Sequence, residues 1–252
     1  MLIKKVLPAA ITAALLSGTS LVQAQEEPIV TGDELVWEIE GNVALVSDYR
    51  FRGISQSDED WAIQGGFDAS WSPGFYVGIW GSSVDFDTNL LGFDGSLELD
   101  YYAGWASQIG DSNWGVDVGY IFYDYPGDDS ENGDYQEIYG SVSWRDLSAG
   151  IAYSDDYYGG TGDFFYYFAD YSLGLPANFS MDFHIGYNDL DKNGGFLANF
   201  TDSYVDYSIG VGVNWVGLDW GLTWVGTDLD KEDVFDTKWA EDTVVFSVAK
   251  AL

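Results

Sequence analysis

The chain contains no cysteine, which excludes disulfides, a lipid-bearing N-terminal cysteine and any thiolate site. Basic residues are also scarce, because nine lysines and arginines stand against 42 acids and give a formal net charge of −33. So acidic a protein repels nucleic acid, and we do not expect nucleic acid among its partners. Beyond the N-terminal segment, no stretch approaches the roughly 18 consecutive apolar residues that a membrane-spanning helix needs.

The N-terminal 24 residues have the features of a secretory signal peptide. Lys4 and Lys5 precede a short apolar run over 6–16, and Val22-Gln23-Ala24 offers a small-residue cleavage site. We expect residues 1–24 to direct export and residues 25–34 to form a short periplasmic segment.

Aromatic residues make up 17% of the chain and charged residues only 20%. Disordered acidic chains are poor in aromatics, so the remainder should fold. From residue 35 onward, apolar and polar residues alternate with the period of 2 that is typical of half-buried strands. In the segment after 178, for example, Phe179 and Met181 alternate with Ser180 and Asp182.

The sequence predicts twelve strands, near 35–52, 61–71, 75–84, 96–107, 114–124, 135–144, 147–154, 163–173, 179–188, 203–215, 218–226 and 243–252. The connections alternate in length. Short ones lie at 72–74, 108–113, 145–146, 174–178 and 216–217, and longer ones at 53–60, 85–95, 125–134, 155–162, 189–202 and 227–242. This rhythm and the even strand count predict that residues 35–252 form an all-β, antiparallel up-and-down barrel of the outer-membrane type.

Tryptophan positions indicate which face of the barrel meets lipid. Nine of the eleven tryptophans lie on the apolar face, namely Trp37, Trp61, Trp71, Trp105, Trp114, Trp144, Trp215, Trp220 and Trp224. Most of them lie near the short turns, whereas a second aromatic group lies towards the long loops: Tyr49, Phe51, Tyr120, Phe122, Tyr153, Phe165 and Tyr187. Two aromatic girdles mark the two interfaces of a membrane, so the apolar face should point outward. The alternative is a soluble barrel with an acidic surface, which gives no reason to sort tryptophan towards one rim.

Two motifs resemble a known family. SDYRFRGISQ (47–56) and FYVGIWGSSVDF (75–86) resemble Gcw_chp, a family of uncharacterised bacterial proteins of which some are called TorF-type porins. The resemblance implies an outer-membrane barrel and a porin label, but no substrate or catalytic residue that could be carried over. The final Leu252 departs from the terminal aromatic residue that is common in such barrels.

If the polar face points inward, many acids line the lumen. The predicted lumen-lining residues are Glu38, Glu40, Asp48, Arg50, Asp68, Glu98, Asp100, Asp117, Glu137, Asp170, Asp182, His184, Asp206 and Asp219. Several inward positions are glycines, among them Gly78, Gly104, Gly119, Gly150 and Gly186, and small residues leave space. We therefore predict a narrow, water-filled passage that prefers cations.

Arg50 and Arg52 are two of only three arginines in the chain. Arg50 could neutralise Asp48, Asp68 or other lumen acids and so stabilise the barrel wall. It could instead oppose acids across a constriction and orient permeating solutes. Arg52 is expected near the outer mouth.

Inward aromatic residues allow two interpretations. Trp80, Tyr123, Tyr139, Tyr166 and Tyr204 could stack a sugar or nucleoside, or they could pack against loops folded into the mouth.

The segment DLDKNGG (189–195) resembles the start of a calcium loop, with Asp189, Asp191 and Asn193 as candidate ligands. Phe200 stands where the glutamate at the twelfth position should be, so we predict neither a metal site nor a cofactor.

The most economical function is passive diffusion of small solutes or cations through an outer-membrane channel. The expected partners are outer-membrane lipid, lipopolysaccharide and the barrel-assembly machinery. The alternatives are a non-conducting barrel that serves as an adhesin, structural or ligand-binding surface protein, and an outer-membrane hydrolase. Hydrolysis is disfavoured because the single histidine, His184, is mid-strand and Ser180 lies roughly 13 Å away along the strand.

Overall fold

The computed structural model describes residues 37–86, 95–127, 133–191 and 195–252. The predicted signal peptide (1–24) and periplasmic segment (25–34) lie outside the described residues. Within the described ranges, no helix is long and apolar enough to cross a membrane.

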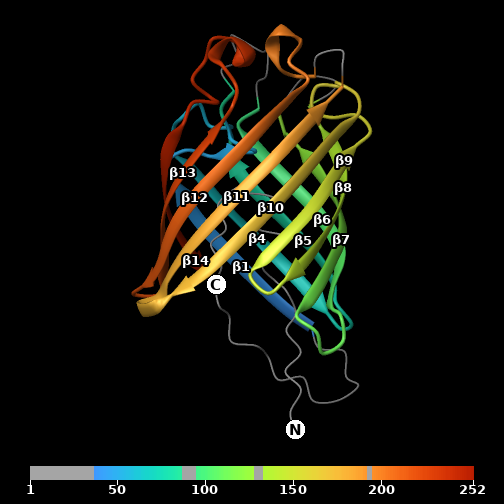
Figure 1. Ribbon diagram of the computed structural model, residues 1–252, viewed down its shortest axis with the longest axis vertical. Helices are drawn as coiled ribbons and strands as arrows, with labels where there is room; N and C mark the ends of the chain where they lie inside the picture. The colour runs from blue at the N-terminus through green and yellow to red at the C-terminus, as the bar shows by residue number, and fades with distance from the viewer. Residues whose placement is uncertain (1–36, 87–94, 128–132, 192–194) are drawn as a thin grey trace.

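Twelve strands in the described residues form one closed antiparallel barrel (Figure 1). They are β1 (Trp37–Val46), β4 (Ala62–Trp71), β5 (Phe75–Ser83), β6 (Leu97–Gln108), β7 (Trp114–Asp124), β8 (Tyr135–Trp144), β9 (Leu147–Ser154), β10 (Phe164–Leu175), β11 (Phe179–Leu190), β12 (Ser203–Trp215), β13 (Leu218–Thr227) and β14 (Thr243–Ala251). Each strand pairs with its sequence neighbour, and β1 closes the ring by pairing with both β4 and β14. The predicted fold is confirmed.

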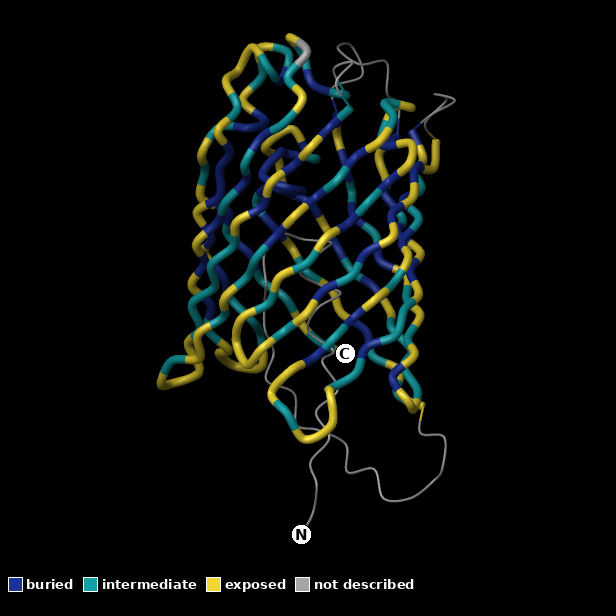
Figure 2. Tube along the Cα trace, turned by 45° about the vertical axis from the view of Figure 1, so that its right-hand side comes forward, coloured by how far each residue is buried: buried dark blue, intermediate teal, exposed yellow. Residues whose placement is uncertain are grey.

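The apolar residues of the strands point outward. Trp37 is 60% exposed and Ile39 is 75% exposed, although both lie within a regular strand. Figure 2 shows the resulting alternation of exposed and buried residues along the strands. Because successive side chains of a strand point to opposite faces, the acids between these apolar residues point into the barrel. The soluble alternative, with its apolar face inside, is therefore wrong.

The predicted alternation of connections is also observed. Short turns gather at the lower end of the barrel in Figure 1 and longer connections at the upper end. The turn at Val216-Gly217 has positive φ at both residues, as a two-residue type I′ hairpin requires. The described parts of the connections contain three short 3₁₀ helices: η1 (Pro176–Asn178), η2 (Ala198–Phe200) and η3 (Lys231–Val234).

The first predicted strand, 35–52, is too long. β1 ends at Val46, where the backbone N–H of Ser47 donates to the carbonyl of Phe246 and the Ser47 hydroxyl accepts from the Phe246 N–H. These bonds complete the pairing with β14, after which the chain turns into the barrel. A short hairpin follows, formed by β2 (Arg50–Phe51) and β3 (Ile54–Ser55).

This turn corrects the placement of two aromatic residues. Tyr49 and Phe51 do not belong to a lipid-facing girdle, because both are buried inside the barrel. Their alternation with polar neighbours continues the strand pattern, but the surface that they contact is the aromatic interior instead of lipid.

Candidate functional site

The hairpin Arg50–Ser55, called the plug hairpin below, lies across the lumen. Its turn residues Arg52 and Gly53 both have positive φ, as a type I′ turn requires. Gly53 is needed here for a second reason, because a side chain at this position would collide with Thr227 of β13 and crowd Asp206 of β12. Phe51 packs edge-on against Tyr123 of β7, on another part of the wall, with their centroids 5.8 Å apart. The plug hairpin therefore contacts β7, β12 and β13 at once.

Arg50 holds the base of the plug hairpin. Its Nε lies 2.5 Å from Asp48 Oδ2, and its Nη1 donates to the backbone carbonyls of Gly53, Trp239 and Glu241. Asp48 also accepts from the Ser55 hydroxyl at 2.6 Å. The predicted Arg50–Asp48 pair is thus present, on the hairpin and not on the barrel wall. These contacts favour the structural interpretation of Arg50, and its role in orienting solutes remains a prediction.

Arg52 is buried, and its partners lie where β8 and β10 begin after long connections. Its two terminal nitrogens donate to the two carboxylate oxygens of Glu137, each at 2.8 Å. The guanidinium carbon also lies 4.3 Å from the ring centre of Tyr166, 4.8 Å from that of Phe164 and 5.8 Å from that of Tyr157. Burial raises the pKa of Tyr157 to about 12, while the neighbouring Arg52 limits the rise. The phenol therefore stays neutral, and Glu137 is the anion that pairs with Arg52.

Two acids of β6, Glu98 and Asp100, are buried beside the plug hairpin. Glu98 accepts a hydrogen bond from the Tyr49 hydroxyl at 3.0 Å. Asp100 is 0% exposed, and neither of its carboxylate oxygens has a hydrogen-bond partner among the described residues. A buried carboxylate without donors is costly, which identifies this part of the lumen as short of positive charge.

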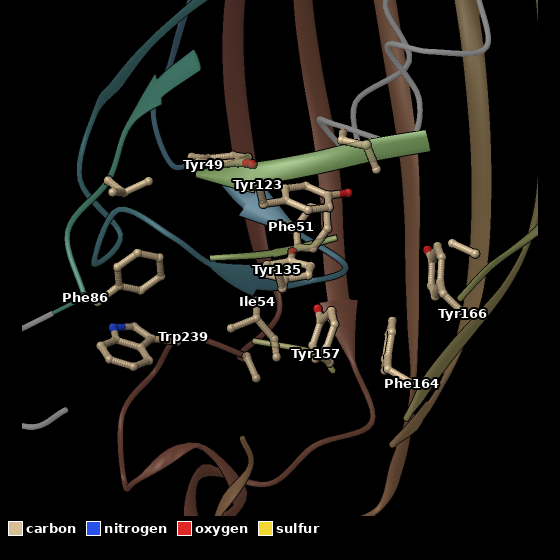
Figure 3. Packing of buried hydrophobic residues seen from close by; sticks show 14 of the residues in the cluster. Tyr49, Phe51, Ile54, Phe86, Tyr123, Tyr135, Tyr157, Phe164, Tyr166 and Trp239 are labelled. Carbon is tan, nitrogen blue, oxygen red and sulfur yellow. The ribbon is translucent and has the colours of Figure 1, made fainter. Parts of the chain in front are cut away.

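The five candidate stacking residues Trp80, Tyr123, Tyr139, Tyr166 and Tyr204 are all buried. Trp80, for example, packs edge-on against Tyr49, with their centroids 5.5 Å apart. In Figure 3, Phe51 and Ile54 of the hairpin lie among aromatic rings of the wall and of neighbouring connections. Packing against an inward-folded loop thus describes these rings in this conformation, and solute stacking remains a prediction.

The connection between β13 and β14 covers the hairpin. The backbone N–H of Ser55 donates to the Trp239 carbonyl at 2.8 Å, and the Trp239 indole donates to Asp58 at 2.7 Å. Lys231 and Glu241 pair at 2.6 Å within this connection, so the pKa of Lys231 is raised and the pKa of Glu241 is lowered by their hydrogen bond. The contribution of this exposed pair is present at neutral pH and is lost as the pH falls through the lowered pKa of Glu241.

The inward glycines do not leave the predicted open space. A methyl group on Gly78 would overlap the Tyr102 ring, one on Gly104 would overlap Tyr76, and one on Gly119 would overlap Tyr139. Gly150 and Gly186 are covered in the same way by Phe168 and Tyr166. Aromatic side chains from neighbouring strands lie flat against the wall at each of these positions, as in the aromatic rescue of strand glycines. The prediction of space at these five glycines is wrong.

Replacing Gly119 with alanine should destabilise the barrel by about 1–3 kcal/mol, because the new methyl group must displace the Tyr139 ring. Gly140→Ala is the matched control, since its methyl group would meet its nearest neighbours at 3.7 Å, an ordinary contact. Urea unfolding in detergent, followed by tryptophan fluorescence, measures both. Equal unfolding free energies would contradict the proposed glycine–ring packing.

The ring-covered wall also holds hydrogen bonds to predicted lumen acids. The Tyr102 hydroxyl donates to Asp68, and the Tyr76 hydroxyl donates to Asp117 at 2.7 Å. Tyr76 and Tyr139 share a further hydrogen bond between their hydroxyls. Each of these phenols contacts a partner from a strand that is not its neighbour in the barrel, so the bonds link strands across intervening strands.

His184 forms a separate network on the same inner surface. Its Nδ1 lies 2.7 Å from Asp170 and its Nε2 lies 2.9 Å from Asp206, while the Tyr166 hydroxyl is 2.8 Å from Nε2. Two carboxylates on the two ring nitrogens suit an imidazolium that donates from both. Ser180 donates to Asp182 at 3.3 Å, which directs its hydroxyl away from His184. The arrangement is a hydrogen-bonded strut and does not pair a serine with a base.

The predicted lumen acids divide into two groups by burial. Those towards the long connections are buried, namely Asp48, Glu98, Asp100, Glu137 and Asp206, and Asp117 is also buried although it lies nearer the short turns. Those towards the short turns are partly accessible: Glu38, Glu40, Asp68, Asp170, Asp182 and Asp219. The plug hairpin and the aromatic rings therefore fill the half of the lumen nearer the long connections, while solvent reaches the other half.

The candidate calcium residues are not brought together by a described site. Asp189 is exposed on β11, Asp191 lies just beyond it, and Asn193 falls outside the described residues. Within the ranges that the structure describes, no group of three or more potential ligands is arranged to hold a metal ion.

The sequence match decides the family. The model of a family described as "Bacterial protein of unknown function (Gcw_chp)" matches residues 32–252. The chain belongs to this family. The TorF-type name remains a resemblance of the motifs. No curated protein is detectably similar to the Gcw_chp chain in sequence.

Several solved structures are similar in fold. The NanC porin in a rhombohedral crystal form aligns with a TM-score of 0.53 at 13% identity, covering 85% of this chain and 98% of that chain. The KdgM porin aligns with a TM-score of 0.51 at 9% identity, covering 86% and 98%. Another structure is the KdgM porin in complex with disordered oligogalacturonate, with a TM-score of 0.50 at 9% identity. At such identities the similarity shows the barrel fold alone.

Proposed function

We propose that this Gcw_chp protein is a porin-like channel of a Gram-negative outer membrane. The observation that carries the proposal is the closed twelve-strand barrel with an apolar exterior and a charged interior. Such a barrel needs lipid around it, and its ionised interior has a use only if polar solutes or water reach it. Outer-membrane lipid, lipopolysaccharide and the barrel-assembly machinery remain its proposed partners.

The proposed solutes are small and preferably cationic. Acids greatly outnumber bases in the predicted lumen, and the accessible half is lined by six of them. The KdgM porin has been solved with oligogalacturonate, a polyanion. The acidic interior of this chain would repel such a ligand, so we do not extend that substrate to it.

The plug hairpin implies that the channel is closed in this conformation. Buried residues occupy the level of Arg52 and Glu137, so conduction requires that the plug hairpin move. This observation also favours a second candidate, a non-conducting barrel whose external connections bind a partner. An enzyme is not proposed, because the His184 network lacks an activated nucleophile among the described residues.

Planar-bilayer recording of the purified full-length chain tests the proposal. We expect rare single-channel steps, with a reversal potential under a salt gradient that indicates cation preference. A variant in which residues 50–55 are replaced by six glycine and serine residues should conduct continuously. Silence from both proteins, each shown by circular dichroism to be folded, would reject the channel in favour of the non-conducting barrel. Anion-directed reversal would reject the cation preference alone.

A further inference from the structure

The Arg52 guanidinium is surrounded by one carboxylate and several aromatic rings. We define the cage as Glu137 of β8, Tyr157 of the β9–β10 connection, and Phe164 and Tyr166 of β10. Glu137 accepts both terminal nitrogens of Arg52 at 2.8 Å, and the three rings surround the guanidinium at 4.3–5.8 Å. None of these four residues belongs to the plug hairpin. The cage residues therefore belong to the wall and one connection, and Phe51 of the plug hairpin adds a fourth ring at 4.6 Å from the guanidinium.

Contacts outside the plug hairpin hold the cage residues in place. Tyr157 stacks on Phe164 with a centroid distance of 3.9 Å and packs edge-on against Tyr135 at 4.8 Å. Tyr166 is held by hydrogen bonds to His184 and Asp206. Rings fixed by such neighbours are pre-organised, which lowers the entropy that a ligand must lose on binding.

Further acids are buried near the cage. Asp100 interacts electrostatically with both Glu98 and Glu137, and Glu137 is the acid that pairs with Arg52. Neither carboxylate oxygen of Asp100 has a hydrogen-bond partner among the described residues. This buried carboxyl group without a hydrogen-bond partner is a second, independent indication that the space beside the cage accommodates positive charge.

Arg52 is attached in a manner that allows it to leave. It sits at φ 48° on a two-residue turn, a left-handed backbone conformation that is unfavourable for a non-glycine residue. The hairpin itself has only two residues in each strand. An unfavourable turn conformation persists where contacts of the side chain offset it, and here those contacts are the ones that Arg52 makes in the cage.

We propose that the cage binds the guanidinium or ammonium group of an organic cation, in competition with Arg52. The inference deepens the proposed function by naming a solute class, and it rests on that function only for its transport role. A guanidinium suits the cage best, because its planar fork matches a bidentate carboxylate and its face stacks on aromatic rings. The incoming cation would take over the contacts of Arg52 and release the plug hairpin.

Ethylguanidinium and ethylurea form a matched pair of probes, since they share one shape and differ in charge. Isothermal titration calorimetry would use the full chain in detergent. In Arg52→Ala we expect ethylguanidinium to bind about tenfold or more tightly than in the parent chain, because the competing side chain is gone. Ethylurea should not bind, and Arg52→Ala/Glu137→Gln should lose ethylguanidinium binding. A folded Arg52→Ala variant that binds neither probe, or both equally, would overturn the proposal.

Two further measurements test the proposal even if Arg52→Ala fails to fold. Arg52→Lys keeps the charge but loses the fork, and should bind ethylguanidinium with an affinity between those of the parent and Arg52→Ala. In bilayers, ethylguanidinium should raise the open fraction of the unmodified channel, whereas ethylurea should not. Conduction without binding of any probe would contradict the proposed cation site but not the channel function. Binding of ethylguanidinium without conduction in any variant would support the cation site and contradict the channel function.

Discussion

Arg52→Ala should raise the open fraction of the channel by roughly 30- to 1,000-fold. The bidentate contact with Glu137 and the surrounding rings together contribute about 2–4 kcal/mol to docking of the plug hairpin. Once Arg52 is removed, a docked hairpin leaves Glu137 buried with the Tyr123 hydroxyl at 3.3 Å and without its cation, whereas an undocked hairpin lets water reach it. The lost docking free energy therefore favours the open form, and about 1.4 kcal/mol corresponds to each tenfold change in the ratio of open to closed channels. Single-channel recording of the purified chain measures the open fraction directly.

Arg145→Ala is the control, because Arg145 is the third and last arginine and lies exposed in the turn between β8 and β9. It removes the same charge without touching the plug hairpin, so its open fraction should match that of the parent. If Arg52→Ala and Arg145→Ala gave the same recordings, the hairpin would not be what closes the lumen.

Asp206→Ala should lower the free energy of unfolding by roughly 3–5 kcal/mol. Asp206 is buried and accepts from His184 at 2.9 Å, from the Asn188 amide at 2.7 Å and from the Tyr166 hydroxyl at 3.2 Å. Alanine leaves all three of these donors without their acceptor, and it leaves the imidazole with one carboxylate partner in place of two. Urea unfolding in detergent or lipid, followed by tryptophan fluorescence, measures the loss.

Asp189→Ala provides the comparison on a neighbouring strand, since Asp189 is exposed and its removal should change the unfolding free energy by less than about 0.5 kcal/mol. Asp206→Asn keeps an acceptor and the volume of the side chain, so it should fall between the two. A loss in Asp206→Ala no larger than that in Asp189→Ala would show that the network carries little of the barrel's stability.

Most of the barrel could be predicted from the sequence because each strand has two faces with different surroundings. The predicted strands 114–124, 135–144, 147–154 and 203–215 match the observed ones residue for residue. An apolar residue on the outer face and a polar residue on the inner face repeat along each strand, so a shift of register by one residue would place every acid in lipid.

The plug hairpin could not be predicted in the same way. Tyr49 and Phe51 continue the alternation of β1, and an aromatic side chain suits both a lipid interface and an aromatic interior. One local signal was present, because the Arg52-Gly53 dipeptide between Phe51 and Ile54 is compatible with a two-residue hairpin turn. It is weaker than Asn-Gly, since arginine has no preference for positive φ.

The binding partners inside the lumen were beyond the reach of the sequence. Arg52 contacts Glu137, 85 positions further along the chain, and His184 contacts Asp206, 22 positions further along. With so many acids pointing inward, no pattern singles out one of them as the partner of a given base. The prediction of open space at the inward glycines failed for a related reason, because the rings that cover these glycines come from adjacent strands.

The sequence by itself determined the strand count, the alternation of turns and loops, and the direction of the apolar face, because all three depend on residues close together in the chain and on the solvent outside. Only the tertiary structure decided that a hairpin folds into the lumen and which acids accept its arginines. Those outcomes depend on closing the barrel, which brings side chains from distant strands into one enclosed space.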